Sequence, residues 1–425
     1  MKAYRVRTGS ILEIFGDPVG DSPILNVPLR DWQRAQVQEC GLALVDVAAE
    51  ADVRDGAPHV VFRDDLFFTR GFLDEFLELA VPRGTGAVAA VPRTEDWERF
   101  AALQDAVVEE RWVRYDALRY VVPASPALPE PVVVDTERGL RFRMPMPKYV
   151  LPSGALTHVV TDRYLLQIIT PMHVHLANLM ANVNRVACYS RGPFLRRARR
   201  WIRREAARRG KLDALDAWIA ARREKLMARP PTKLAYRLAR HVNKIGKNCD
   251  IHPTAYLIGC TVGDNVRIGA YTVCEAAVIG DGAQIGEFCH IRLSTVGPRT
   301  MILQVARLNL TVTYEDVFFL SRTISFGVIG RAGQVYNSIY TDFRVDGGPM
   351  TTIFRGKVVD SRMPFLGVTV GHGARVAGGL IVGPGRIVPN EVTILPPEDI
   401  VYSRAPKGTK PGDVIRLGER RKENV

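Results

Sequence analysis

The chain has 425 residues, of which 47% are hydrophobic and 24% charged. This balance is typical of globular proteins with two or three domains, and it excludes a disordered, collagen-like or disulfide-rich chain. The chain contains no run of about 18 apolar residues, so no membrane-spanning helix is expected, and the first residues do not resemble a secretory signal. The six cysteines are scattered without a CxxC pair. We therefore expect reduced thiols and a cytoplasmic location.

Strand and helix signals alternate over residues 1–145. An apolar stretch at 24–27 is followed by an expected helix over 29–39, which Gly41 ends, and then by a strand at 42–47. A strand at 59–62 precedes a helix that Thr69 can cap, and a strand at 87–91 precedes a helix expected over 96–110. Such alternation predicts βαβ units and a mostly parallel sheet.

Residues 146–250 are expected to form a basic helical connector, with helices near 174–187, 194–209, 212–228 and 231–243. Residues 191–250 contain 19 Lys/Arg and 5 Asp/Glu, so they carry 19 − 5 = +14, and the rest of the chain carries 13 − 14 = −1. The densest part, 193–211, has an apolar stripe among arginines. It fits either a solvated helix packed on a neighbouring domain or an amphipathic helix on an anionic membrane surface, which would make the protein peripheral at the inner face of the membrane. Nucleic acid is not an expected partner, since no binding module accompanies the charge.

A six-residue period begins after residue 250. Its longest run places aliphatic side chains six residues apart at Val370, Val376, Val382, Val388 and Ile394. This period is neither that of an ordinary strand nor that of a helix, and it is the hexapeptide signature of a parallel β-helix. The fold class expected is thus α/β plus β-solenoid, with the β-helix over residues 251–425. The period weakens between Pro298 and Pro364, which predicts an insertion at about 298–364.

The stretches NCDIHPTAYLIGCTVGDNVRIGAYTVCEAAVIGDGAQIGEF and FLGVTVGHGARVAGGLIVGPGRIVP resemble the left-handed β-helix domains of hexapeptide acyltransferases. This resemblance implies a left-handed helix, a homotrimer and acyl-CoA as a co-substrate. It also implies one histidine that acts as general base on an acceptor amine or hydroxyl, for which His290 and His372 are the candidates. His252 is expected to be a structural residue of the first coil.

The stretches SPILNVPLRDWQRAQVQECGL and HVVFRDDLFFTRGFLDEFLEL look like parts of sugar-1-phosphate nucleotidyltransferases. The whole chain therefore resembles the family of fused uridylyltransferase/acetyltransferase proteins that act on amino-sugar phosphates. The resemblance implies a reduced, Rossmann-like domain. Asp64 and Asp65 follow the apolar run 60–62, where α/β sheets bind ligands, so they are candidates to hold Mg²⁺ between nucleotide phosphates, with Arg63 and Arg70 as candidate phosphate contacts. The alternative is that the two carboxylates only form a turn or a helix N-terminal charge before Leu66. The family's GxGTR loop is absent, and TGSILEIFGDPVGDSP stands in its place.

Three further sets of residues are weaker candidates. His173 and His175 are either a metal pair or the entry of a helix after Pro171. Asp342 and Asp346 alternate with arginine in an extended segment and fit ion pairs within the insertion. The arginines that could recognise a phosphorylated sugar are Arg331, Arg344 and Arg355.

These features predict a transferase that acts on a sugar phosphate or nucleotide sugar, by nucleotidyl transfer, acyl transfer or both. The missing phosphate loop leaves an alternative open, because backbone amides and a lysine normally hold the transferring phosphates. In that alternative, a degenerate sugar-nucleotide domain on a trimeric β-helix senses a ligand or serves as a non-catalytic scaffold.

Overall fold

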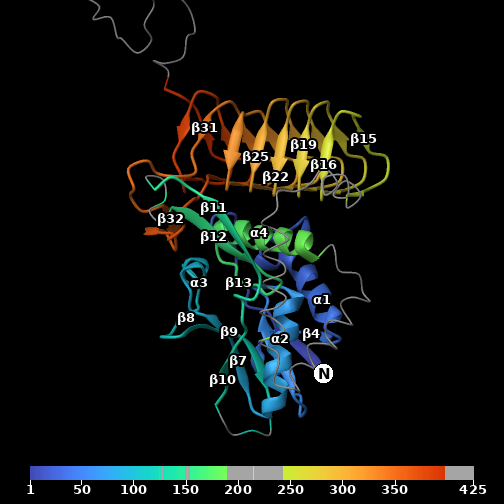
Figure 1. Cartoon of the computed structure of the whole chain (residues 1–425), viewed down its shortest axis with the longest axis vertical. Helices are drawn as coiled ribbons and strands as arrows, with labels where there is room; N and C mark the ends of the chain where they lie inside the picture. The colour runs from blue at the N-terminus through green and yellow to red at the C-terminus, as the bar shows by residue number, and fades with distance from the viewer. Residues whose placement is uncertain are drawn as a thin grey trace, which may run out of the picture.

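The computed structural model describes residues 1–123, 125, 128–148, 151, 154–188, 214 and 243–397. Two bodies stack along its long axis, an α/β domain that contains the N-terminus and a β-helix, with helix α4 (Pro171–Cys188) between them (Figure 1). The expected helices at 194–209, 212–228 and 231–243, and the basic segment 193–211, lie outside the described residues.

The N-terminal domain is built on a mixed sheet whose strand order is β10-β7-β9-β5-β1-β4, with β8 paired to β9. β1 is parallel to β4 and β5, whereas β9 runs antiparallel to both of its neighbours, β5 and β7. The sheet is therefore less parallel than expected. Its strands are β1 (Lys2–Val6), β4 (Ala43–Val47), β5 (His59–Arg63), β7 (Ala87–Pro92), β8 (Val107–Val108), β9 (Trp112–Val121) and β10 (Glu130–Val133).

Helices α1 (Leu29–Glu39) and α2 (Arg70–Ala80) pack on each other, and their inward sides join one hydrophobic core with the sheet. The expected helix over 29–39 is confirmed. Helix α3 (Glu95–Phe100) is shorter than the expected 96–110, because the chain turns back and β8 pairs with β9. The smaller elements are η1 (Val19–Asp21), β2 (Pro23–Ile24), β3 (Val27–Pro28), η2 (Glu50–Asp52), β6 (Leu66–Phe68), η3 (Val81–Arg83), β11 (Leu140–Pro145), β12 (Ala155–Val160) and β13 (Leu165–Gln167).

The C-terminal body is a left-handed parallel β-helix, as the hexapeptide period predicts. Each coil contributes one short strand to each of three parallel sheets, and the first coils repeat every 17 residues, as in the bond from Asp264 N–H to Asp281. Aliphatic residues of the six-residue period, among them Val370, Val376 and Val388, are buried inside. The interior also holds Cys260, Cys274 and Cys289, and burial raises the pKa of each of these thiols.

The first sheet contains β14 (Lys244–Ile245), β17 (Thr261–Val262), β20 (Val278–Ile279), β23 (Thr295–Val296), β26 (Val312–Thr313), β29 (Val328–Ile329), β34 (Thr369–Val370) and β37 (Ile387–Val388). The second contains β15 (Asp250–Ile251), β18 (Arg267–Ile268), β21 (Gln284–Ile285), β24 (Met301–Ile302), β27 (Phe318–Phe319), β30 (Gln334–Val335), β35 (Arg375–Val376) and β38 (Thr393–Ile394). The third contains β16 (Tyr256–Ile258), β19 (Val273–Glu275), β22 (His290–Arg292), β25 (Arg307–Asn309) and β28 (Thr323–Ser325), and the paired strands β31 (Ile339–Tyr340) and β36 (Ile381–Val382) continue it.

The departure from regular coils is narrower than the insertion expected at about 298–364. Coils continue through β31, and only residues 341–368 leave the helix. They include a hairpin of β32 (Thr351–Phe354) and β33 (Lys357–Asp360). The six-residue signal weakens before this point because aromatic and polar residues occupy the coils, for example Phe318, Phe319 and Tyr314, and they keep the register without the repeat's usual composition.

Candidate functional site

The outer surface of the third β-helix sheet brings His290 together with charged side chains. In each three-residue strand the middle side chain points inward, as Ile291 and Cys274 do, and the two flanking side chains point outward. β22 therefore presents both His290 and Arg292 on the outside. Strand register places Glu275 of β19 beside Arg292, and Arg307 of β25 beside His290.

Glu275 holds the centre of this group. Its Oε2 lies 3.6 Å from Nε2 of His290 and 3.5 Å from Nε of Arg292. Nε2 of His290 is buried without a hydrogen-bond partner, although the side chain as a whole is 38% exposed. A carboxylate beside an imidazole favours the tautomer with its proton on the near nitrogen, which leaves the lone pair of Nδ1 open. The arrangement suits proton abstraction from a bound acceptor, with guanidinium groups available for an anion.

His372, the other candidate base, is held between the two bodies. Nδ1 accepts a hydrogen bond of 2.7 Å from the Arg331 N–H, and Nε2 therefore carries the proton and donates to Oδ2 of Asp17 at 2.8 Å. The ring stacks on Phe15 with centroids 4.5 Å apart and meets the edge of Tyr314. Because both ring nitrogens are engaged, no lone pair is left for an acceptor, and the geometry suits a contact between domains.

The pair Asp64 and Asp65 follows β5, at the edge of the sheet where the loop after β1 also lies. Oδ1 of Asp64 accepts from the backbone and the hydroxyl of Thr8, at 3.0 and 2.6 Å. Asp65 is buried and accepts from Arg63 at 2.5 Å and from Gln167 at 2.9 Å. Burial raises the pKa of Asp65, and the Arg63 guanidinium and the Gln167 amide oppose that shift.

This edge does not fit a resident magnesium ion. Asp64 and Asp65 turn to different partners, and one oxygen of Asp65 is taken by a guanidinium. Within the described part of the chain, no group of three or more His, Cys, Asp or Glu side chains is arranged to hold a metal. Two buried atoms here, Oδ1 of Asp65 and Nε of Arg63, have no hydrogen-bond partner. The expected phosphate contact Arg70 lies elsewhere, in ion pairs with Glu39 and Asp74 on helices α1 and α2.

The two histidines near the start of α4, His173 and His175, have different surroundings. His173 caps the start of α4, since its Nδ1 accepts from the N–H groups of Ile169 and Thr170, and burial lowers its pKa to about 4. His175 points to the other side and meets Phe326 of the β-helix, so the two histidines do not form a metal pair.

The three arginines expected to recognise a phosphorylated sugar lie apart from one another. Arg331 pairs with Glu315 and Asp17, Arg344 with Asp346, and Arg355 with Asp105 of the N-terminal domain. The Arg331–Asp17 and Arg355–Asp105 pairs link the two domains, the Arg331–Glu315 pair lies within the β-helix, and the Arg344–Asp346 pair lies within the insertion.

Sequence reasoning missed Glu275, Arg292 and Arg307. A signal was present, because the spacing of 17 residues that relates the coils also relates Glu275 to Arg292 and His290 to Arg307. His252, expected to be structural, is exposed in the first coil and bonds to Thr254. No helix among the described residues is long and apolar enough to cross a membrane.

Comparison with known proteins gives matches among solved structures but not among family models or curated proteins. No family model matches the sequence, and no curated protein matches it. Two solved structures are point mutants of perosamine N-acetyltransferase from Caulobacter crescentus with CoA and GDP-perosamine. Both are 19% identical over 38% of this chain, covering 60% and 61% of theirs, with TM-scores of 0.19 and 0.15. A hexapeptide transferase family protein from Anaplasma phagocytophilum is 17% identical over 36% of this chain and 78% of its own, with a TM-score of 0.16.

This chain thus spans about three fifths of the length of the first two structures. Likenesses at such TM-scores carry no argument about activity. The resemblance to fused uridylyltransferase/acetyltransferase proteins is not confirmed by these comparisons.

Proposed function

We propose that this chain is an acyltransferase that moves an acyl group from a thioester such as acyl-CoA to an amine or hydroxyl of a sugar phosphate or nucleotide sugar. The observation that carries the proposal is His290 on the outer face of the third sheet, with Glu275 on one side and Arg307 on the other. His290, rather than His372, is assigned as the base because Nδ1 of His290 has no hydrogen-bond partner among the described residues.

The reaction follows from these groups. Nδ1 of His290 takes a proton from the acceptor as the acceptor nitrogen or oxygen attacks the thioester carbonyl. The carbon–sulfur bond then breaks, the new amide or ester forms, and the thiolate leaves with the proton that the imidazolium returns. Glu275 stabilises the imidazolium between the two steps, and Arg307 and Arg292 suit the phosphate of the acceptor.

The test is release of thiol from acetyl-CoA by the full chain, with a panel of nucleotide sugars and sugar phosphates as acceptors. His290→Asn should lower kcat by about 10²- to 10⁴-fold, the range of general-base contributions. The matched control is His252→Asn, another exposed histidine of the β-helix, which should leave kcat unchanged. Equal activity in the wild type and His290→Asn would contradict the assignment. No thiol release with any acceptor would favour the non-catalytic scaffold.

The other predictions from resemblance stay proposals. A homotrimer, a cytoplasmic location and a membrane contact through 193–211 rest on the sequence alone. Nucleotidyl transfer in the N-terminal domain lacks support from the geometry, because Asp64 and Asp65 turn to different partners and Arg70 lies elsewhere.

A further inference from the structure

The three corners of the β-helix differ in the residues that take left-handed backbone conformations. Such conformations cost least for glycine and asparagine. The corner between the first and second sheets follows this rule, because most of its left-handed positions are glycine or polar. They are Asn248, Asn265, Gly282, Arg299, Asp316, Ala332, Gly373 and Glu391.

The corner between the third and first sheets breaks the rule where it meets the N-terminal domain. Its left-handed positions after Gly259 are Ala276, Leu293, Leu310 and Phe326. Helix α4 lies against this corner, as shown by the 2.7 Å bond from Asn182 to the Ala276 carbonyl and by the contact of His175 with Phe326. At this corner, therefore, apolar residues in the strained left-handed conformation occur where helix α4 packs against the β-helix.

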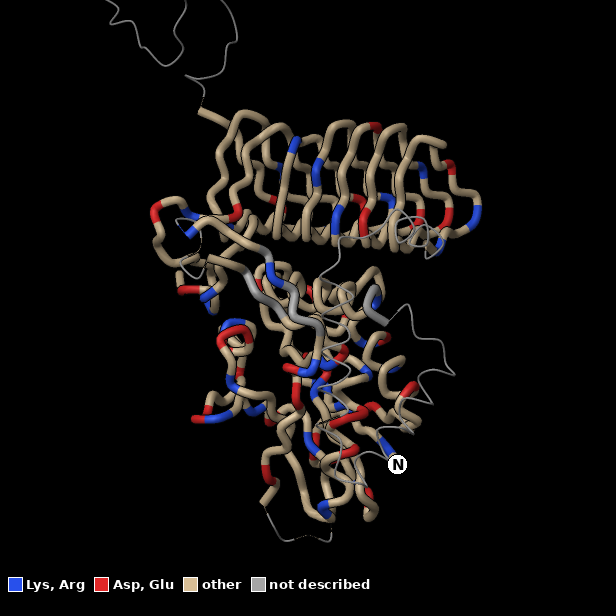
Figure 2. Tube along the Cα trace, viewed as in Figure 1, with Lys and Arg blue, Asp and Glu red and all other residues tan. Residues whose placement is uncertain are grey.

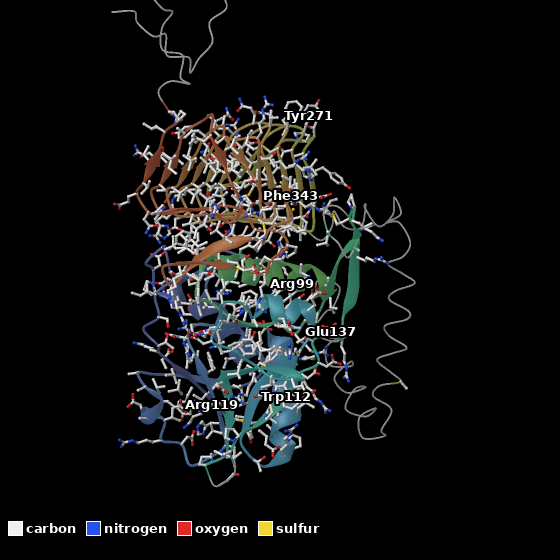
Figure 3. The ribbon with its side chains drawn as sticks, turned by 90° about the vertical axis from the view of Figure 1, so that its left-hand side faces the viewer. Arg99, Trp112, Arg119, Glu137, Tyr271 and Phe343 are labelled. Carbon is white, nitrogen blue, oxygen red and sulfur yellow. The ribbon has the colours of Figure 1, made fainter. Side chains whose placement is uncertain are left out.

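The corner between the second and third sheets also breaks the rule, but no described residue covers it. Tyr271, Phe288 and Val305 have φ of 56°, 55° and 63°, and these residues are 59%, 60% and 58% exposed. Figure 3 shows Tyr271 on the side of the β-helix that lies away from the N-terminal domain. Three successive coils therefore keep bulky apolar residues where strain is higher and burial is lacking, which points to an external ligand.

The rings of Tyr271 and Phe288 are stacked, with centroids 5.2 Å apart and planes 16° from parallel. The outer faces of such a stack are flat and apolar. The planar ring of any nucleobase can therefore stack on them. The tube of the β-helix carries mostly uncharged residues with separated charged positions (Figure 2). Arg307 of β25 lies two residues after Val305 and has no ion-pair partner among the described residues.

The spacing suits a nucleotide. Successive coils are about 4.8 Å apart, so Arg307 lies two coils and about 10 Å along the axis from Tyr271. A diphosphate attached to a stacked nucleoside spans such a distance, and guanidinium groups bind phosphate well. A second protein copy fits less well, because a row of three side chains is far smaller than the roughly 800 Å² that each partner buries in a specific interface.

We propose that Tyr271 and Phe288 form a stacking platform for the nucleobase of a nucleoside diphosphate whose phosphates reach Arg307. This assignment rests on the proposed function, because it places a nucleotide-linked acceptor beside His290. It narrows the acceptor class from sugar phosphates in general to nucleotide sugars.

The experiment measures binding of ADP, GDP, UDP and inorganic pyrophosphate to the full chain by calorimetry. Tyr271→Asn and Phe288→Asn remove a ring while asparagine keeps the left-handed conformation accessible. Each should weaken nucleoside diphosphate binding by about tenfold, the typical loss of one stacking contact. Phe288→Tyr keeps an aromatic ring and should bind nucleoside diphosphates as the wild type does. Val305→Asn is the comparison on the same corner: it removes no ring, so it should weaken binding less than either ring variant. Pyrophosphate affinity should be the same in all variants.

Unchanged nucleotide affinity in both ring variants would overturn the proposal, as would the absence of nucleotide binding to the wild type. Sedimentation that shows an oligomer dissociated by Phe288→Asn would also overturn it, by assigning the corner to a subunit interface. The readout separates the two proposals. Ring-dependent binding without thiol release leaves the platform standing and removes acyl transfer, whereas acyl transfer with unchanged acceptor KM in both ring variants removes the platform alone.

Discussion

The role that a side chain can play depends more on its hydrogen-bond and ion-pair partners than on the sequence around it. His290 and His372 both sit in hexapeptide sequence, and both are candidates for a base. The structure engages the two nitrogens of His372 with Arg331 and Asp17 and leaves Nδ1 of His290 open. The same holds for the acidic pair after β5, where Asp64 is bonded to Thr8 at the edge and Asp65 is buried beneath it.

Asp65→Asn should stabilise the protein at about pH 7.5. Because burial raises the pKa of Asp65, the folded state disfavours its charged form, and this cost is present above the folded-state pKa. The cost disappears as the pH falls below the unfolded-state pKa, where Asp65 is protonated in both states. The melting temperature of Asp65→Asn should therefore exceed that of the wild type at about pH 7.5, with a difference that shrinks towards about pH 4.

Asp105→Asn is the matched comparison for this pH series. Its carboxyl is partly exposed. Burial acts to raise its pKa, but the bonds from Arg355 and Gln167 and the nearby positive charges together outweigh burial and lower the pKa. The sign of its effect should be opposite, with a loss of stability at neutral pH that fades in acid. A larger gain for Asp65→Asn in acid than at neutral pH would contradict the assigned cause.

At the scale of elements, α4 is the piece that connects the two bodies. Its buried polar side chains lie on the sides that face other elements. Asn178 donates to the Pro23 carbonyl at 2.7 Å and accepts from Leu25 N–H at 2.8 Å and from the Thr295 hydroxyl at 3.0 Å. One amide thus joins the β2–β3 hairpin, α4 and the β-helix.

Asn178→Ala should lower the free energy of unfolding by about 2 kcal/mol or more, because buried donors and acceptors on three elements lose their partner. Chemical denaturation followed by circular dichroism measures this change. Gln38→Ala, an exposed amide on α1, is the control and should change stability by less than about 0.5 kcal/mol. Similar effects of the two substitutions would show that the amide of Asn178 does not join the elements as described.

At the scale of the whole molecule, contacts far apart in sequence fix the β-helix to the N-terminal domain. Besides the pair of His372 and Asp17, Asn390 donates to the Phe15 carbonyl at 2.8 Å. At the tip of the β32–β33 hairpin, Arg355 pairs with Asp105 at 2.7 Å. These contacts join the loop after β1 to the last coils, and the loop after α3 to the β32–β33 hairpin.

A double-mutant cycle of His372→Ala and Asp17→Ala should give a coupling energy of about 1 kcal/mol or more, as expected for partly buried groups in direct contact. The measurement is the free energy of the first unfolding transition. Arg344 and Asp346 form the comparison pair, an exposed ion pair within the insertion, for which the coupling should be smaller. Independent effects of His372→Ala and Asp17→Ala would remove this contact as a link between the domains.

Local sequence patterns correctly predicted the elements that are determined by residues close together in the sequence. The β-helix follows from a period that repeats within each coil, and α1 follows from an apolar spacing ended by Gly41. Patterns failed where pairing with distant strands decided the outcome. β8 takes residues that local signals assigned to a helix, because β9 offers it a partner, and β9 itself runs against its neighbours.

The sequence by itself determined the β-helix, the α/β character of the N-terminal half and the list of histidines and carboxylates worth testing. The tertiary structure decided which of them stand together. Glu275, His290 and Arg307 come together because coils of 17 residues stack in register. Both ring nitrogens of His372 are engaged because the Arg331 N–H of the β-helix and Asp17, from the other end of the chain, bond to the same ring. The spacing of residues along one coil can be predicted from the local sequence. The partner of a side chain cannot, because it depends on how distant segments pack together.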